Sequence, residues 1–188
     1  ALNNSDKSQP QVINDLISQV GEGLNADVAA LYAKDENGDL DCQYIWSKNQ
    51  SMSAEEYVSE WQRANMKFRS WQNGQGTGRL VDNGYLVIDA KHIDDATKKI
   101  MSEGSVKSFT AVPVYVNGRY GAVFVLANTS MNKLWTAEEI EYAKQTADVL
   151  RCSLERIESD DSVKRINSVL LDTYNYMDEG IFIREIDT

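Results

Sequence analysis

The sequence predicts an α+β domain built on an antiparallel sheet. Three observations support this: helical spacing near both ends of the chain, two pairs of apolar runs each joined by an Asn-Gly turn, and enough apolar residues for a core. Of the 188 residues 42% are hydrophobic, and glycine and proline are scarce, so a packed domain is expected rather than a disordered chain. Helices should cover at least one face of the sheet.

The first fifty residues predict a helix followed by a hairpin. The helix begins at Ser8–Gln11, a capping-box pattern with proline in the first turn, and ends near Gly21–Gly23. Residues 28–33 form a short apolar run typical of a strand. Residues 40–46 alternate between apolar and polar side chains, which indicates a half-buried strand. Asn37-Gly38 between the two runs favours a tight turn.

The middle of the chain predicts short elements around a glycine-rich loop. A second capping box opens an amphipathic, aromatic helix over 53–68. Residues 73–78 are rich in glycine and predict a loop or pocket lid, because the lysine and the preceding strand of a phosphate-binding P-loop are missing. A brief strand is expected over 85–89 and a short helix over 94–102.

The densest strand signal is a second hairpin. The apolar runs 109–116 and 120–127 flank Asn117-Gly118, a tight-turn sequence. The second run is almost entirely apolar, so both of its faces should be covered.

A long helix follows the second hairpin, with Thr136 as its N-cap and Glu139 as the reciprocal partner. Its apolar residues are spaced by three and four: Ile140, Ala143, Ala147, Leu150, Leu154 and Ile157. This spacing predicts a dimer helix with a two-position heptad seam, although packing on the domain's own sheet remains an alternative. The next apolar residue in a seam, Val163, lies six positions beyond Ile157, which predicts a helix bend or linker over 159–166.

Composition excludes several functional classes. The net charge of −10 argues against a nucleic-acid partner, and half of it lies in 138–161, with 3 basic against 8 acidic residues. No apolar run reaches the ~18 residues of a membrane span. With two cysteines and one histidine the chain has few ligands for a metal centre. The low number of cysteines favours a reducing, cytoplasmic setting.

Several motifs in this order resemble a GAF domain of bacterial signalling proteins. They are Phe68–Trp71, Gly84–Asp89, Gly104–Val114, Asn117–Ala122 and Leu134–Ile140. The resemblance assigns residues 1–158 to one GAF-like sensory domain, including its terminal helices. It implies an antiparallel sheet of about six strands, with the terminal helices on one face and pocket-covering helices and loops on the other.

The same resemblance implies a small-molecule pocket between the second strand, residues 68–95 and the start of the strand at Phe109. The cofactor or ligand is unknown, and the pocket candidates are the aromatic and polar residues Tyr44, Trp46, Trp71, Tyr85, His92, Phe109 and Thr110. The alternative for each aromatic residue is a place in the core. His92 could donate a hydrogen bond to a ligand or lie in a solvated loop.

The tail resembles the start of a PAS domain. Asn167–Leu171 and Met177–Ile183 carry this resemblance and imply a leading helix and a first strand, so 167–188 is expected to begin an incomplete second domain. The bend at 159–166 would then be a relay point between two domains.

Together these features predict a non-catalytic sensory module of a larger protein. A small molecule would bind the GAF-like domain, and the last helix would pass the change to an output domain, such as a diguanylate cyclase or a histidine kinase, within a homodimer. The alternative is a dimerisation or scaffolding domain with a filled pocket and no ligand. An enzyme of the methionine sulfoxide reductase type is disfavoured, because Cys42 and Cys152 are not clustered near the pocket region.

Overall fold

The computed structural model of the chain describes residues 8–49, 77–89, 91–93, 95, 97–99 and 106–184, with side-chain burial up to residue 173. In this part of the chain five strands form one antiparallel sheet in the order β2-β1-β5-β4-β3. The strands are β1 Val28–Lys34, β2 Leu40–Ser47, β3 Leu86–Ile88, β4 Ser108–Val116 and β5 Arg119–Asn128. The predicted α+β class is confirmed, and the strand count is close to the six expected.

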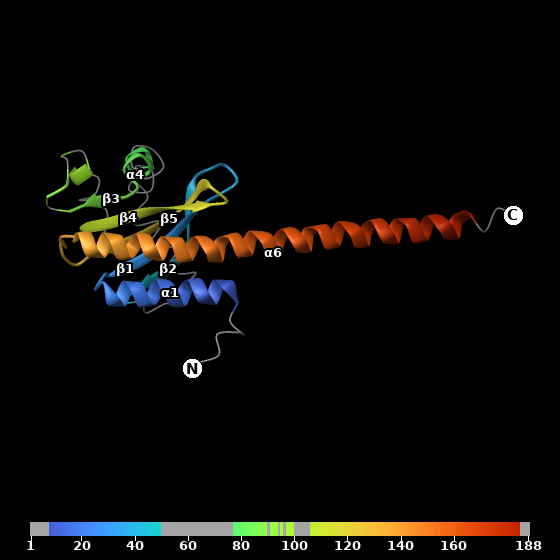
Figure 1. Ribbon diagram of the computed structural model, residues 1–188, viewed down its shortest axis with the longest axis horizontal. Helices are drawn as coiled ribbons and strands as arrows, with labels where there is room; N and C mark the ends of the chain where they lie inside the picture. Colours follow the sequence, from blue (N-terminus) through green and yellow to red (C-terminus); the bar gives the residue numbers. More distant parts are fainter. Residues whose placement is uncertain are drawn as a thin grey trace.

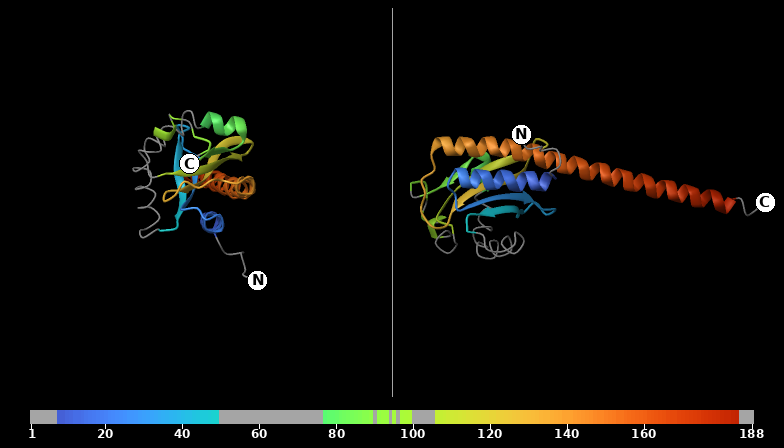
Figure 2. Two further views of the ribbon diagram at one scale, coloured as in Figure 1. Left: turned by 90° about the vertical axis from the view of Figure 1, so that its left-hand side faces the viewer. Right: turned by 90° about the horizontal axis from the view of Figure 1, so that it is seen from below.

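The helices lie on both faces of the sheet. Helices α1 (Gln9–Gly23) and α6 (Ala137–Arg184) run side by side on one face, and α4 (Thr77–Asn83) lies on the other (Figures 1 and 2). Each face has its own apolar cluster. We call them the α1/α6 core, which includes Leu31, Phe124 and Leu150, and the α4 core, which includes Leu80 and Phe109. Helix α4 differs from the sequence prediction, since its first residues fall in the expected glycine-rich loop.

The residues predicted to begin α1 and α6 make the expected capping hydrogen bonds. The Ser8 N–H donates to Gln11 Oε1 at 3.0 Å at the start of α1. At the start of α6 the Thr136 N–H donates to Glu139 Oε2 at 2.9 Å, and the Glu139 N–H donates to Thr136 Oγ1 at 3.2 Å. These reciprocal bonds satisfy donors that the first turn of a helix cannot pair internally.

A bulge in β2 overturns one prediction about side-chain direction. Leu31 of β1 pairs with Tyr44, whereas the next residue of β1 pairs with Cys42, which leaves Gln43 as an extra residue. An extra residue reverses the side-chain alternation beyond it. Cys42 therefore belongs to the α4 core, while Tyr44 and Trp46 pack against the α1/α6 core. The alternation over 40–46 predicts that Cys42, Tyr44 and Trp46 share one face of the sheet, and this prediction is wrong.

Helix α6 is continuous over 48 residues, so the predicted bend at 159–166 is wrong. This segment contains neither glycine nor proline, and the Ser162 hydroxyl donates to the Glu158 carbonyl at 2.8 Å inside the helix. The strand expected at 181–183 is also helical. The assignment of 167–188 to a second domain stays a prediction.

The tip of the β4–β5 hairpin is joined to α6. Asn117 and Gly118 have φ of 49° and 75°, the left-handed conformation that a tight hairpin turn needs. The Asn117 N–H donates to Glu155 Oε1 at 3.0 Å, and its side-chain amide donates to Glu158 Oε2 at 2.8 Å. These bonds lie near the point where α6 leaves the body of the domain (Figure 1).

Candidate functional site

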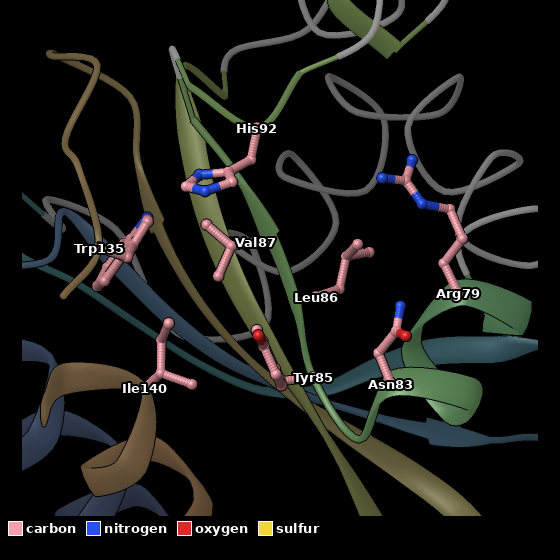
Figure 3. Close-up of a pocket in the computed structure, with 8 residues that line it drawn as sticks. All are labelled: Arg79, Asn83, Tyr85, Leu86, Val87, His92, Trp135 and Ile140. Carbon is pink, nitrogen blue, oxygen red and sulfur yellow. The ribbon is translucent and has the colours of Figure 1, made fainter. Parts of the chain in front are cut away.

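A cavity of about 510 Å³ lies beside β3, the strand at one edge of the described sheet. We call it the β3-edge cavity. Its walls come from α4, β3, the turn after β3 and the start of α6 (Figure 3). The lining residues are Arg79, Asn83, Tyr85, Leu86, Val87, His92, Trp135 and Ile140. This volume is in the range of small-molecule sites.

The two ends of the cavity differ in chemistry. Arg79 and Asn83 of α4 lie at one end, and His92, Trp135 and Ile140 lie at the other (Figure 3). The apolar middle is formed by Leu86 and its neighbour in β3. The guanidinium of Arg79 and the amide of Asn83, beside apolar side chains, can donate to a small molecule that has hydrogen-bond acceptors.

His92 is held in place by Asp89, a buried residue that is only 1% exposed. The Asp89 Oδ1 accepts from the Lys91 N–H at 2.8 Å and the His92 N–H at 3.0 Å, and it lies 2.8 Å from His92 Nδ1. Burial raises the pKa of the Asp89 carboxyl, but these hydrogen bonds and the nearby imidazole outweigh burial and lower it. An ionised carboxylate fixes the proton of a neutral imidazole on Nδ1, so Nε2 is left as an acceptor.

Trp135 brings the start of α6 into the cavity wall. The residue is 6% exposed, and its indole N–H has no hydrogen-bond partner among the described residues. The nitrogen edge of the ring lies toward His92 (Figure 3). The Lys133 ammonium lies 4.4 Å from the ring centroid, a cation–π contact that holds the other side of the indole. The indole N–H is therefore a buried, unpaired donor in a residue that lines the cavity.

A second contact ties α6 to the same edge of the sheet. The Lys144 ammonium lies 5.0 Å from the centroid of the Tyr85 ring, and the Tyr85 residue is 39% exposed. Ile140 lines the cavity one turn earlier. Ile140 and Lys144 of α6, and Trp135 just before it, thus face the cavity or its rim.

The structure brings together two of the seven predicted pocket residues, Tyr85 and His92. Tyr44 and Trp46 do not line this cavity, because the β2 bulge turns them toward the α1/α6 core. A Cβ on Gly21 would lie 2.4 Å from the Trp46 ring, which shows how closely Trp46 packs on α1.

The remaining pocket candidates are not in the β3-edge cavity. Phe109 is 1% exposed in the α4 core, which is the core alternative left open for each aromatic residue. Thr110 is also buried, and its hydroxyl has no partner among the described residues. Trp71 lies outside the described residues.

The sequence does not predict the other six lining residues as pocket residues: Arg79, Asn83, Leu86, Val87, Trp135 and Ile140, the last of which the sequence assigns to the dimer helix. The sequence identifies Trp135 only as a hydrophobic partner of Ile140 at the helix start. Its place beside His92 follows from the strand order, which puts β3 at an edge next to the first turns of α6. No spacing along the chain reports that proximity.

The six residues of the predicted dimer helix face the domain itself. Ala143, Ala147 and Leu150 are at most 5% exposed in the α1/α6 core, and Ile140, Leu154 and Ile157 pack against it. The three buried residues cannot contact a second chain, so their assignment to a dimer seam is corrected to intramolecular packing.

A family model described as GAF domain matches residues 10–154 of this chain. The chain belongs to the GAF domain family. No curated protein matches the sequence as a relative. The GAF fold is shared with GAF3 of Slr1393 from Synechocystis sp. PCC6803, at 15% identity and a TM-score of 0.64, covering 83% of this chain and 99% of that one.

Two further GAF-related structures show the same fold. The red light-absorbing state of NpR6012g4, a red/green cyanobacteriochrome, matches at 15% identity and a TM-score of 0.60, covering 81% of this chain and 97% of that one. A domain of a putative two-component sensor histidine kinase from Sinorhizobium meliloti 1021 matches at 17% identity and a TM-score of 0.58, covering 85% and 99%. These likenesses show a shared fold. GAF domains are generally regulatory and non-catalytic.

Two features are absent from the described residues of the GAF domain. No group of three or more histidine, cysteine or acidic residues could hold a metal ion. None of the described helices is long and apolar enough to cross a membrane.

Proposed function

We propose that this GAF domain is a non-catalytic sensory module that binds a small molecule in the β3-edge cavity. The bound state would be passed through α6 to an output domain, such as a histidine kinase or a diguanylate cyclase. The observation that carries the proposal is the shared wall: the cavity is lined by Ile140 of α6, the helix that leaves the domain, and by Trp135, two residues before that helix begins. A ligand there touches sheet and helix at once.

The ligand should carry a hydrogen-bond acceptor group beside an apolar part. The buried indole N–H of Trp135 is an unpaired donor, and Arg79 adds positive charge at the far end of the cavity. An unpaired buried donor costs about 1–3 kcal/mol, which a ligand acceptor would recover. Small carboxylates and nucleotides therefore come first among the compounds to test.

Binding is tested by thermal shift with a panel of small carboxylates, amino acids and nucleotides. A ligand at 100 times its dissociation constant adds about 2.7 kcal/mol, which for a chain of this size raises Tm by roughly 5–10 °C. Tyr85→Ala should abolish that shift. The matched control is Tyr115→Ala, because Tyr115 is also 39% exposed but lies outside the cavity.

The relay is tested by hydrogen exchange of the bound and free protein. Ligand should slow exchange of amides at the start of α6, over residues 137–144, relative to the end of α1. Exchange that changes only around α4 would contradict a relay through α6, even with binding established.

A scaffolding domain without ligand is the second candidate. The burial of Phe109 in the α4 core favours this candidate. The Phe109 ring fills space on the face of the sheet where the pocket is expected. A panel that produces no shift in the wild type, and none in either tyrosine variant, would support scaffolding over sensing.

A further inference from the structure

The β3-edge cavity crosses the edge of the sheet instead of lying on one face. Leu86 belongs to the α4 core and its neighbour Val87 packs against the α1/α6 core, yet both line the cavity. Successive residues of a strand point to opposite faces, so the cavity passes from the α4 face around β3 to the α6 face. Arg79 lies at one end and Trp135 at the other (Figure 3). A ligand that fills the cavity is therefore elongated and meets different chemistry at its two ends.

The end at the α6 face offers one hydrogen-bond donor and one acceptor. The Trp135 indole N–H is buried and has no partner among the described residues. The nitrogen edge of its ring lies toward His92 (Figure 3). His92 Nδ1 lies 2.8 Å from Asp89 Oδ1, and this contact leaves Nε2 of the neutral imidazole as an acceptor. A ligand group that matches this end must therefore both accept and donate.

A primary carboxamide has the matching pair of groups. Its carbonyl oxygen accepts and its NH₂ group donates, on the same carbon and in one plane. A methyl ketone of the same shape has no donor for His92 Nε2. An ionised carboxylate has acceptors alone, so one of its oxygens would face the Nε2 lone pair with the Asp89 carboxylate behind it. The chemistry of this end thus favours a carboxamide over two groups of similar size.

The end at the α4 face suits a carboxylate. Arg79 and Asn83 line it. A guanidinium has five N–H donors, so Arg79 can donate to a ligand in addition to any other partner, and the Asn83 amide supplies two more donors. Hydrogen bonds from a guanidinium to a carboxylate are stronger than those between neutral groups. Between the two ends, Leu86 and Val87 offer apolar surface to a short methylene chain.

We infer that the ligand of the β3-edge cavity carries a primary carboxamide at one end and a carboxylate at the other, joined by a short apolar chain. The inference rests on the proposed function, because it names the ligand class of the same cavity. The Trp135 N–H donates to the carbonyl oxygen of the carboxamide, whose N–H donates to His92 Nε2. Asp89 is a positioning residue, since it acts on the ligand through the imidazole.

The ligand class is tested with the monoamides of succinic, glutaric and adipic acid, which differ in chain length. Each monoamide is compared with the methyl ketone in which CH₃ replaces NH₂, and with the parent diacid. The dissociation constants for the full chain are measured by isothermal titration calorimetry. At the chain length that fits, we expect the monoamide to bind about 10-fold or more tightly than its ketone and its diacid, because each of these leaves His92 Nε2 without a donor.

The acceptor is tested with His92→Phe, which keeps a ring and removes both ring nitrogens. The His92 side chain is 59% exposed, so the fold should tolerate the change. In this variant the dissociation constants of the monoamide and the ketone should come within about 2-fold of each other. A structural role of His92 alone would weaken both compounds and leave their ratio unchanged.

The donor is tested in the wild type by NMR, because Trp135 is buried and a variant there also changes packing. The monoamide should shift the indole N–H signal of Trp135, which is assigned by its loss in Trp135→Phe. The matched control is the indole N–H signal of Trp46, since Trp46 packs against the α1/α6 core and does not line the cavity. That signal should stay in place.

Each result decides the inference. A preference for one monoamide that His92→Phe removes, together with a shifted Trp135 signal, supports it. Equal binding of monoamide, ketone and diacid, a preference that His92→Phe leaves unchanged, or an unshifted Trp135 signal would overturn it and leave the cavity as a binding site. Absence of binding by all the probes also overturns it, whereas the proposed function fails only if the wider panel of carboxylates, amino acids and nucleotides gives no thermal shift either.

Discussion

Gly21→Ala should destabilise the domain, although alanine is the better helix former. Gly21 lies in the last turn of α1, and an added Cβ would lie 2.4 and 2.5 Å from two atoms of the Trp46 ring and 3.2 Å from the Ala29 Cβ. The helix preference for alanine contributes at most about 1 kcal/mol. Overpacking in a core costs about 1–3 kcal/mol, because the indole or the helix must move.

Gly23→Ala in the same helix is the control, since nothing lies within 4 Å of a Cβ at that position. We expect Gly21→Ala to be roughly 1–3 kcal/mol less stable than Gly23→Ala. For a chain of this size that difference lowers Tm by roughly 3–10 °C, measured by circular dichroism or calorimetry. If Gly21→Ala melts at or above the temperature of Gly23→Ala, the close contact between α1 and Trp46 is refuted.

Three further predictions concern the frame around the cavity. Thr136→Ala removes one half of the capping box of α6 and should cost about 1 kcal/mol in urea unfolding, whereas Thr136→Ser should cost less. Leu150→Ala leaves a hole at a fully buried position and should cost about 2–5 kcal/mol by the same measurement, and a loss below 1 kcal/mol would contradict the packing of α6 on the sheet. Asp27→Ala should cost about 2 kcal/mol at pH 7 because Asp27 Oδ2 accepts hydrogen bonds from Thr129 and Ser130. Burial raises the pKa of the Asp27 carboxyl, but these bonds outweigh burial and lower it below 3.8, so the stability difference should disappear as pH falls from that value through the folded pKa.

The sequence predicts the parts of the fold that depend on local chemistry. The Asn117-Gly118 turn and the Thr136–Glu139 capping box each use residues whose backbone preference is the same in any context. The almost entirely apolar second run also predicts that both faces of β5 are covered, and seven successive residues of that strand are buried.

The errors arise where one residue changes the geometry of its neighbours in the chain. Gln43 gives no signal that it is the extra residue of a bulge, yet it decides that Tyr44 and Trp46 face α1 rather than the α4 core. Likewise, apolar spacing alone cannot separate one helix with two faces from two helices with a bend, because burial of Ile157 and exposure of Val163 are properties of the fold.

The candidate site is harder to predict because its residues come from four segments that only the strand order brings together. Tyr85 and His92 can be found from their position near one strand. Trp135 belongs to a clear helix-start pattern. Because that pattern already explains a tryptophan at this position, the sequence gives no sign of its second role beside the cavity. Its unpaired indole N–H becomes visible only when burial and partners are known.

The hydrogen bonds from Asn117 hold α6 at Glu155 and Glu158. The part of the helix beyond these residues can therefore act as a lever. Beyond Glu158 the helix continues to Arg184, a reach of about 40 Å at 1.5 Å per residue. A tilt of only about 5° at the hairpin would move the far end by roughly 3–4 Å over that reach. A shift in the cavity too small to alter the sheet would therefore become a displacement at the end of α6 as wide as a side chain.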